Sequence, residues 1–285
     1  MVWTPEPTYD KPDISVRATT LYYQIMAPFM LPSLSGRLLN LFRCRENKCF
    51  FPRNREHPPT AGEFDGLVRF EPVAQKNGRT EDYLYVANEN EIVACAKAQT
   101  VEFHGWGSRA GAVEAPDRLV IDLDPDPALG FAAVRDAAFQ VRRAFDTINL
   151  ESFAMLSGGK GIHIIVPLEP VAGWDEVREF AKTFCTALAK SAPDKFTVAL
   201  PKRDRRGRIF LDFLRNQRTA TAIQPYSARA RTGMPVAAPV GWDELQSITR
   251  ANSFTIADVE ELLNRAKSSK FRKWAKEPEV LPRLR

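Results

Sequence analysis

The sequence contains no apolar run of the roughly 18 residues that a membrane-spanning helix needs. Its first residues lack the basic and then apolar stretches of a secretion signal. Cysteine is scarce, and Cys44, Cys49, Cys95 and Cys185 are scattered along the chain, which is typical of a reduced, cytosolic protein. Cys44, Cys49 and His57 could begin a zinc site, but no fourth ligand follows at a convincing spacing. We therefore expect a cytoplasmic protein without a membrane partner.

The net charge is small, at +5, but it is unevenly distributed. Between Lys202 and Arg231 there are nine basic residues and two acidic ones, so this window carries more positive charge than the entire chain. Apolar residues make up 44% of the sequence, which indicates a globular protein, and no internal repeat is visible. A basic stripe of this kind favours a nucleic acid or polyphosphate ligand.

Two aspartates follow an apolar run that predicts a strand. Asp122 and Asp124 come at the end of the run 119–121 and precede Pro125, which should end the strand. Residues two apart in a strand point to the same face. Asp212 lies in a second apolar run, 209–214, and could come from a neighbouring strand. Three carboxylates on one face repel each other unless a cation holds them, and hard oxygen ligands suit Mg²⁺ or Mn²⁺.

Two other interpretations of these aspartates are weaker. They could be exposed turn residues, which fits Asp126, but Asp122 is flanked by Ile121 and Leu123. Haloacid-dehalogenase-type phosphatases and nucleotide-sugar transferases also use this motif. The phosphatases carry Thr or Val two residues after the second aspartate, where this chain has Asp126. The pattern therefore favours a metal site, at which two divalent ions can hold a triphosphate and a sugar hydroxyl for in-line displacement.

A glycine-rich segment follows the predicted strand 153–156. Ser157, Lys160 and Gly161 belong to a tight turn that lets a ligand approach the backbone closely. The turn is not a Walker loop, because Lys160 is followed by glycine, but its amides, hydroxyl and lysine suit a phosphate. His163 should lie just beside this turn. A histidine on an apolar strand is often a core residue, but its place after a polar loop favours a functional role.

Helices and strands are mixed without strict alternation, which predicts an α+β fold. A loose N-terminal arm over 1–14 should precede one two-lobed domain over 15–265 and a basic tail over 266–285, in which Phe271 and Trp274 are interleaved. Thr255 with Asp258 resembles a capping box and predicts the start of a helix that runs toward Arg265. We expect helices over 17–41 (broken at Pro28 and Pro32), 132–145 and 174–189; strands over 67–70, 83–86, 101–104, 153–156 and 162–167; a helix or strand over 92–98; and a turn over 105–107.

Together these motifs resemble the polymerase domain of bacterial ligase D, a member of the archaeo-eukaryotic primase superfamily. The matching segments, in family order and spacing over roughly 20–265, are the Phe50 and Phe51 pair, 101–109, 117–125, 157–168, and a last block from Ile209 through Asp212, Arg215, Asn216, Thr221 and Ser227 to Arg231. The resemblance implies a primase-type core in which two β-sheets face each other across a cleft, with flanking helices.

The resemblance also implies template-dependent nucleotide addition to DNA ends, with NTPs or dNTPs as substrates and two Mn²⁺ or Mg²⁺ ions. Asp122, Asp124 and Asp212 then bind the metals and carry catalysis. The expected nucleotide-binding residues are Ser157, Lys160, Gly161, His163, Ser227 and Arg229, and the expected DNA-binding residues are Arg17, Phe50, Phe51, Arg53, Arg55, Arg205, Arg215 and Asn216. Aromatic residues of this kind stack on template bases, and core packing is the alternative for the Phe pair.

The sequence departs from the family where a lysine usually helps to hold a 5′-phosphate. Ser15 and Val16 occupy those positions, and Arg17, Arg53 and Arg55 are the candidate substitutes. No ligase or phosphoesterase segment is recognised, so a separate DNA ligase and end-binding protein are the expected partners of a nucleoid-associated enzyme in non-homologous end joining. A gap-filling repair polymerase or primase is the alternative, and a non-catalytic DNA-end-binding scaffold is the alternative from a different class.

Overall fold

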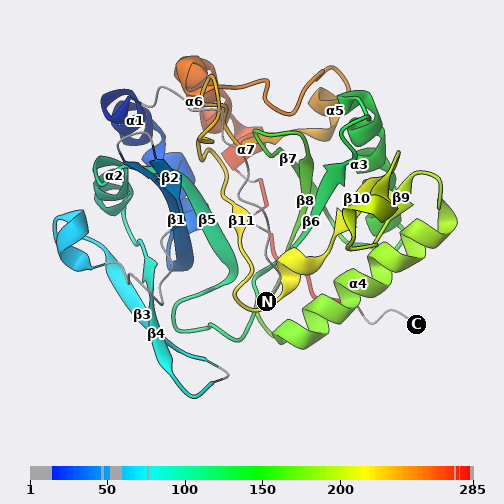
Figure 1. Ribbon diagram of the computed structural model, residues 1–285, viewed down its shortest axis with the longest axis horizontal. Coiled ribbons are helices and arrows are strands. Elements are labelled where there is room, and N and C mark those ends of the chain that lie inside the picture. The colour runs from blue at the N-terminus through cyan, green and yellow to red at the C-terminus, as the bar shows by residue number, and fades with distance from the viewer. Residues whose placement is uncertain are drawn as a thin grey trace.

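The computed structural model describes residues 15–45, 48–51, 60–75, 77–272, 274–275 and 277–282. The predictions for Arg53, Arg55, His57 and the arm over 1–14 lie outside these residues. Two main sheets face each other, and each carries helices on its outer side (Figure 1). This arrangement confirms the predicted α+β class.

The six-stranded sheet is built around the strand that carries the two aspartates. Its neighbouring strands are antiparallel except for the last pair, which is parallel. Along the central strand, Leu119, Ile121 and Leu123 join the core, while the residues between them face the other sheet. The order is β12 (Ala238–Val240), β7 (Phe153–Leu156), β8 (Ile162–Pro167), β6 (Arg118–Pro125), β10 (Ile209–Asp212) and β9 (Phe196–Thr197), with α3 (Phe131–Asp146) and α4 (Trp174–Ser191) on the core face.

The four-stranded sheet forms the other half of the molecule, together with a separate hairpin. At the point where the two sheets meet, Val120 and Met155 pack with Ile223 in a small apolar cluster. The strand order is β11 (Ala222–Ile223), β5 (Thr100–Arg109), β1 (Arg37–Arg45) and β2 (Lys48–Phe50), with α1 (Val16–Leu34), η1 (Ala61–Phe64) and α2 (Glu89–Lys97) beside it; β3 (Arg69–Ala74) and β4 (Thr80–Tyr85) form the hairpin.

The first helix is shorter at its C-terminal end than predicted, and it is continuous. It ends at Leu34, and Gly36 then takes a positive φ of 70° that turns the chain into β1. The apolar run at the start of β1 forms a strand that is buried on both faces, and such a run has no period that distinguishes a strand from a helix. Pro28 and Pro32 lie within α1 and do not divide it, because the opposite face is anchored in the core.

The predicted turn over 105–107 is wrong, because β5 runs straight through it. The two glycines permit close packing. A Cβ on Gly105 would lie 2.5 Å from Cδ of Arg37, and one on Gly107 would lie 3.1 Å from the ring of Trp174. Glycine in a strand interior marks such close approach as often as it marks a turn.

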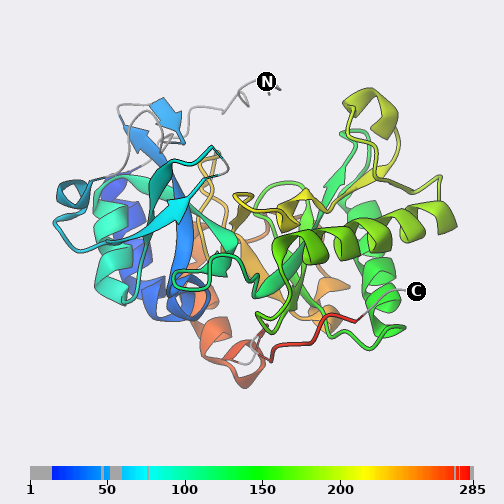
Figure 2. The same ribbon diagram turned by 90° about the horizontal axis from the view of Figure 1, so that it is seen from below.

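The C-terminal elements connect the two halves, as the view from below shows (Figure 2). Helix α6 (Val259–Lys267) contacts α1, and the ring of Trp274 lies 5.9 Å from that of Phe153 in β7. The predicted capping box is present at Thr255 and Asp258. The remaining elements are η2 (Lys202–Arg205), η3 (Leu214–Asn216), α5 (Trp242–Leu245), η4 (Ile256–Asp258), α6 (Val259–Lys267) and α7 (Ser269–Arg272).

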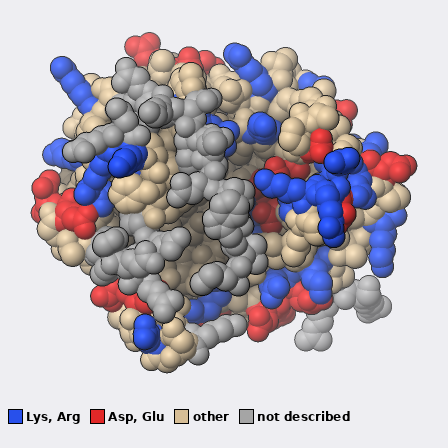
Figure 3. All heavy atoms as spheres, in the orientation of Figure 1, with Lys and Arg blue, Asp and Glu red and all other residues tan. Residues whose placement is uncertain are grey.

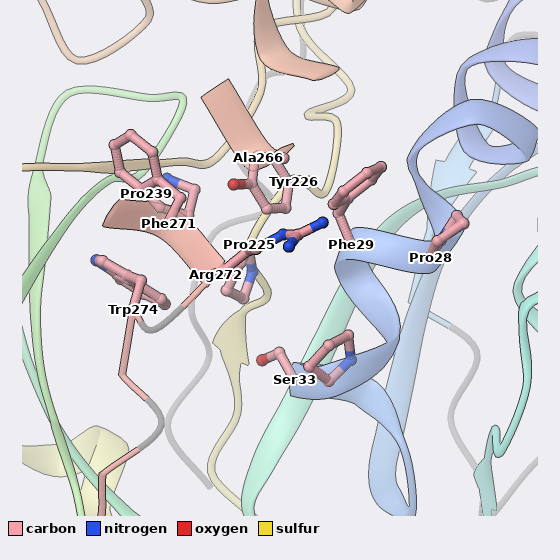
Figure 4. A pocket seen from close by; sticks show the side chains of 11 residues that line it. Pro28, Phe29, Ser33, Pro225, Tyr226, Pro239, Ala266, Phe271, Arg272 and Trp274 are labelled. Carbon is pink, nitrogen blue, oxygen red and sulfur yellow. The ribbon is translucent and has the colours of Figure 1, made fainter. Parts of the chain in front are cut away.

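A cavity of about 250 Å³ lies between α1 and this C-terminal segment (Figure 4). Phe29 lines it from α1, Phe271 and Trp274 from the C-terminal side, and the Arg272 side chain projects into it. Within the described residues, no helix is both long and apolar enough to cross a bilayer.

The expectation of fully reduced cysteines is wrong for one pair. Cys44 and Cys49 form a disulfide across the β1–β2 hairpin, where the two residues are direct register partners. Cys95 and Cys185 are free and buried. The pairing also removes Cys44 and Cys49 as thiolate ligands for zinc.

Candidate active site

Three aspartates on two neighbouring strands share one face of the six-stranded sheet. Asp122 of β6 is the direct register partner of Asp212 of β10, as the two apolar runs predicted, and Asp124 follows on the same face. The side chains of Asp122 and Asp212 are only 16% and 13% exposed, whereas that of Asp124 is 57% exposed. An exposed turn is therefore excluded for Asp122.

Two arginines lie among these carboxylates. Arg215 places Nη2 3.2 Å from Oδ2 of Asp122 and Nε 3.2 Å from Oδ2 of Asp212. Arg205 places Nη1 3.3 Å from Oδ2 of Asp124. Among the residues described, no three His, Cys, Asp or Glu side chains are gathered as a ready metal site. Arg215 joins two of the carboxylates instead.

The carboxylates are not fully compensated by this positive charge. Burial raises the pKa of Asp212, and Arg215 offsets the effect only in part. Burial and the neighbouring Asp122 also raise the pKa of Asp124. At Asp122 burial acts in the same direction, but His163 and Arg215 outweigh it and the pKa is lowered. Two of three carboxylates thus still favour additional positive charge, and hard oxygen donors of this type fit a divalent cation.

The glycine loop lies directly against the end of β6. Ser157 Oγ accepts hydrogen bonds from the amides of Gly159 and Gly161, each at 3.2 Å, and thereby folds the loop on itself. A Cβ on Gly161 would lie 2.3 Å from the carbonyl oxygen of Leu123, so only glycine permits this contact. Lys160, at the tip of the loop, is exposed. The loop therefore offers a cation and closely packed backbone beside the aspartates.

His163 lies on β8 as the direct register partner of Asp122. Its Nε2 is 3.5 Å from Oδ1 of Asp122, and its Nδ1 is buried without a hydrogen-bond partner. Burial lowers the pKa of His163 to about 4, against a partial opposing effect of Asp122. The imidazole is therefore neutral at neutral pH and can offer one ring nitrogen to a ligand.

A second cluster of polar groups, which the sequence reasoning missed, lies on β5 across from the loop. Glu102 Oε2 is 2.7 Å from Nε2 of His104 and accepts a 3.1 Å hydrogen bond from Nε of Arg229. Arg229 Nη1 also donates to the carbonyl oxygen of Ser157, at 2.7 Å. The sequence signal for this cluster is an acidic residue, Glu102, two residues before His104 in a predicted apolar strand. The aspartates Asp122 and Asp124 show the same spacing of polar residues at the end of an apolar run.

The predicted Phe pair lies beside this cluster. The ring of Phe51 is 5.0 Å from that of His104 and 4.7 Å from that of Phe42. Phe50 and Phe51 are nevertheless 40% and 42% exposed, so neither is a core residue. An exposed aromatic ring that is fixed from one side can stack on a base from the other.

Comparison with known proteins matches most of this chain, including the three aspartates and the glycine loop. A family model described as the LigD primase-polymerase domain matches residues 17–269. The chain belongs to the LigD primase-polymerase family. It is 33% identical over 259 residues to the multifunctional non-homologous end joining protein LigD of Pseudomonas aeruginosa, a match that covers 88% of this chain and 30% of that protein. With the bifunctional LigD of Bacillus subtilis the identity is 30% over 241 residues, and the match covers 82% and 37%.

The chain thus spans about a third of the length of these LigD relatives. A solved structure, the polymerase domain from Mycobacterium tuberculosis ligase D in complex with DNA, superimposes with a TM-score of 0.79 at 25% identity, covering 98% of this chain and 99% of that one. The resemblance inferred from the motifs is confirmed, and with it the LigD polymerase fold.

Two residues of the predicted ligand sites have side chains that are engaged inside this LigD primase-polymerase fold. Asn216 is 2% exposed, and its amide pairs with both backbone groups of Val120 at 2.7 Å, so it fastens η3 to β6. Ser227 is fully buried, and its Oγ accepts from the amide of Phe103 at 2.8 Å. Both side chains use their hydrogen-bonding groups inside the fold.

The predicted basic residues lie at different places. Arg205 packs its guanidinium 3.6 Å above the ring of Phe210, in a region where Lys and Arg side chains gather over β9 and β10 (Figure 3). Lys202, at the start of η2, is exposed, and its charge opposes the rise that burial causes in the pKa of Asp124. Arg17 is exposed in the first turn of α1. The prediction for Arg53 and Arg55 lies outside the described residues.

Proposed function

We propose that this chain is a template-dependent nucleotidyltransferase, a primase-polymerase that extends DNA 3′ ends or fills gaps with NTPs or dNTPs. One observation carries the proposal: Asp122 and Asp212 face each other on paired strands, with the glycine loop packed against the same strand end. Membership of the LigD primase-polymerase family supports it.

In this proposal Asp122, Asp124 and Asp212 hold two divalent ions, Mn²⁺ or Mg²⁺. When bound, such ions lower the pKa of the attacking 3′-hydroxyl and stabilise the leaving pyrophosphate. Arg215 already bridges two of these carboxylates and would have to yield its place to them.

The chain's own groups then bind and orient the triphosphate. Lys160 comes from the tip of the loop, Gly161 lets the loop backbone pack closely against β6, and Arg229 contacts the loop at the carbonyl oxygen of Ser157. The two cations place positive charge where negative charge develops on the phosphates. His163, neutral and buried beside Asp122, supplies a hydrogen-bonding nitrogen without additional charge.

The DNA would lie along the exposed Phe pair and the basic surface near η2. Phe50 and Phe51 offer rings for template bases, and Arg205, Arg215 and Arg17 offer cations for the backbone. The polymerase domain from Mycobacterium tuberculosis ligase D, which has the same fold, was solved in complex with DNA, and this supports the assignment.

The biological role we propose is repair of DNA breaks by non-homologous end joining, because the named relatives are end-joining proteins. A DNA ligase and an end-binding protein would be the partners, and the bacterial nucleoid would be the site of action. Gap filling in excision repair and primer synthesis use the same chemistry and remain the alternatives within the class.

The decisive experiment is extension of a gapped duplex with a 5′-phosphate, assayed with NTPs and dNTPs in Mg²⁺ and in Mn²⁺. We expect the wild-type chain to add nucleotides opposite the template, and the Asp122→Asn variant to add none. DNA binding without addition under every condition would instead identify a non-catalytic end-binding scaffold.

A further inference from the structure

Glu102 is a buried carboxylate at the junction of three separate segments. It lies on β5 and is 2% exposed. One oxygen accepts from the amide of Ala230 at 2.8 Å, and the other contacts His104 at 2.7 Å and Arg229 at 3.1 Å. A carboxylate removed from water requires such partners, and here they account for both of its oxygens.

Arg229 continues the connection from Glu102 to the glycine loop. Its Nε faces Glu102 while its Nη1 donates to the carbonyl oxygen of Ser157. The packing is equally close, because a Cβ on Gly158 would lie 2.8 Å from Cγ of Arg229. Glu102, Arg229 and Ser157 therefore form a continuous link from the four-stranded sheet to the loop beside the aspartates.

We infer that Glu102 is a positioning residue, which holds Arg229 against the glycine loop and thereby fixes the groups that receive the triphosphate of the incoming nucleotide. The inference rests on the proposed nucleotide site and extends it to a residue that itself touches no nucleotide. The planar guanidinium of Arg229 can meet two partners at once only when both are fixed.

Because Glu102 is charged, a neutralising role and a positioning role predict opposite changes in ATP affinity when the charge is removed. A carboxylate near a triphosphate opposes binding through its charge alone. If Glu102 only neutralised Arg229, then the Glu102→Gln variant would bind ATP more tightly. If Glu102 positions Arg229, the same variant would bind ATP more weakly, because the guanidinium would lose its fixed direction.

The test compares Glu102→Gln with Glu91→Gln in the otherwise complete chain. Glu91 is 3% exposed and accepts hydrogen bonds from the Ala87 amide, Asn88 and Arg69, so it loses the same charge at equal burial, away from the aspartates and the loop. Equilibrium binding of ATP and of AMP is measured by calorimetry, and primer extension provides KM and kcat.

We expect Glu102→Gln to raise the Kd for ATP about tenfold or more, the scale of misplacing one charged hydrogen bond. The effect on AMP should be much smaller, because AMP lacks the outer phosphates. In extension, the nucleotide KM should rise more than kcat falls. Glu91→Gln should leave the Kd values for ATP and AMP unchanged, even if its Tm falls as much as that of Glu102→Gln.

Unchanged or tighter ATP binding by a folded Glu102→Gln variant overturns the inference, as does an equal loss for ATP and AMP. If Glu102→Gln does not fold, Glu102→Asp keeps the charge beside Arg229 but withdraws the carboxylate by one carbon, and it should show the same ATP-selective loss. A wild-type chain that binds ATP but adds no nucleotide refutes the proposed polymerase function alone, whereas a chain that binds no ATP refutes both.

Discussion

Replacing Gly161 with alanine should displace the glycine loop from β6 without removing any of its polar groups. The added Cβ would lie 2.3 Å from the carbonyl oxygen of Leu123 and 3.5 Å from Oδ1 of Asp122. A Cβ rarely lies closer than about 3.0–3.4 Å to a non-bonded heavy atom, so the loop and β6 must separate by about 1 Å to accommodate it. The atom in the way belongs to the backbone of the strand that carries the aspartates, so a side-chain rotation cannot relieve the contact.

The expected cost has two parts. Overpacking of this kind destabilises a fold by about 1–3 kcal/mol, which for a chain of this length lowers Tm by roughly 2–6 °C. A displacement of about 1 Å between reacting groups can reduce the rate about 100-fold. We therefore expect kcat/KM for nucleotide addition to fall by about two orders of magnitude while the protein remains folded at 25 °C.

The assay is primer extension at varied nucleotide concentration, accompanied by thermal denaturation. Gly62→Ala is the control, because a Cβ at that exposed position meets nothing within 4 Å. Its activity should equal that of the wild type. A Gly161→Ala variant with activity within threefold of the wild type would refute the argument that close packing of this loop sets the geometry of the site.

Three further predictions follow from the site. Asp212→Asn should abolish nucleotide addition and leave DNA binding intact by fluorescence anisotropy, because phosphate contacts come mainly from the basic surface; weakened DNA binding would contradict it. Burial alone would raise the pKa of Glu102, but Arg229 and His104 outweigh it and hold this pKa at about 2, against an ordinary 4.5. The ionised carboxylate should therefore add about 3 kcal/mol to the free energy of unfolding above pH 4.5, and this contribution should disappear as the pH falls toward 2. Urea denaturation at pH 5 and pH 3 should therefore show a smaller acid loss in Glu102→Gln than in the wild type, and equal losses would argue against it. Phe51→Ala should weaken primer-template binding by about 1–3 kcal/mol, whereas Phe29→Ala, in the cavity beside α7, should not.

The aspartates and the loop could be predicted because their chemistry is local. An acidic residue in an apolar strand is expensive to bury, so Asp122 and Asp212 stand out in one dimension, and the register of β6 and β10 brings them together as expected. Glu102 and His104 carried the same local signal, but their partner Arg229 is distant in the sequence, and no pattern in the sequence pairs them.

Where prediction failed, long-range packing decided the outcome. The run at the start of β1 is buried on both faces, so its period could not distinguish strand from helix. Gly105 and Gly107 accommodate neighbouring side chains within a strand, and only the folded structure shows which ones. The amide of Asn216 completes the hydrogen bonding of the strand next to it, a contact that no pattern in the sequence indicates.

Arg215 gives the aspartate site a counter-ion of its own. A guanidinium between Asp122 and Asp212 offsets part of the charge of these two buried carboxylates before any cation binds. If the proposed metal ions bind there, they would compete with the arginine, and their apparent affinity would be the difference between two interactions with the same carboxylates. The metal affinity of the site could then be tuned at Arg215 without changing a single ligand.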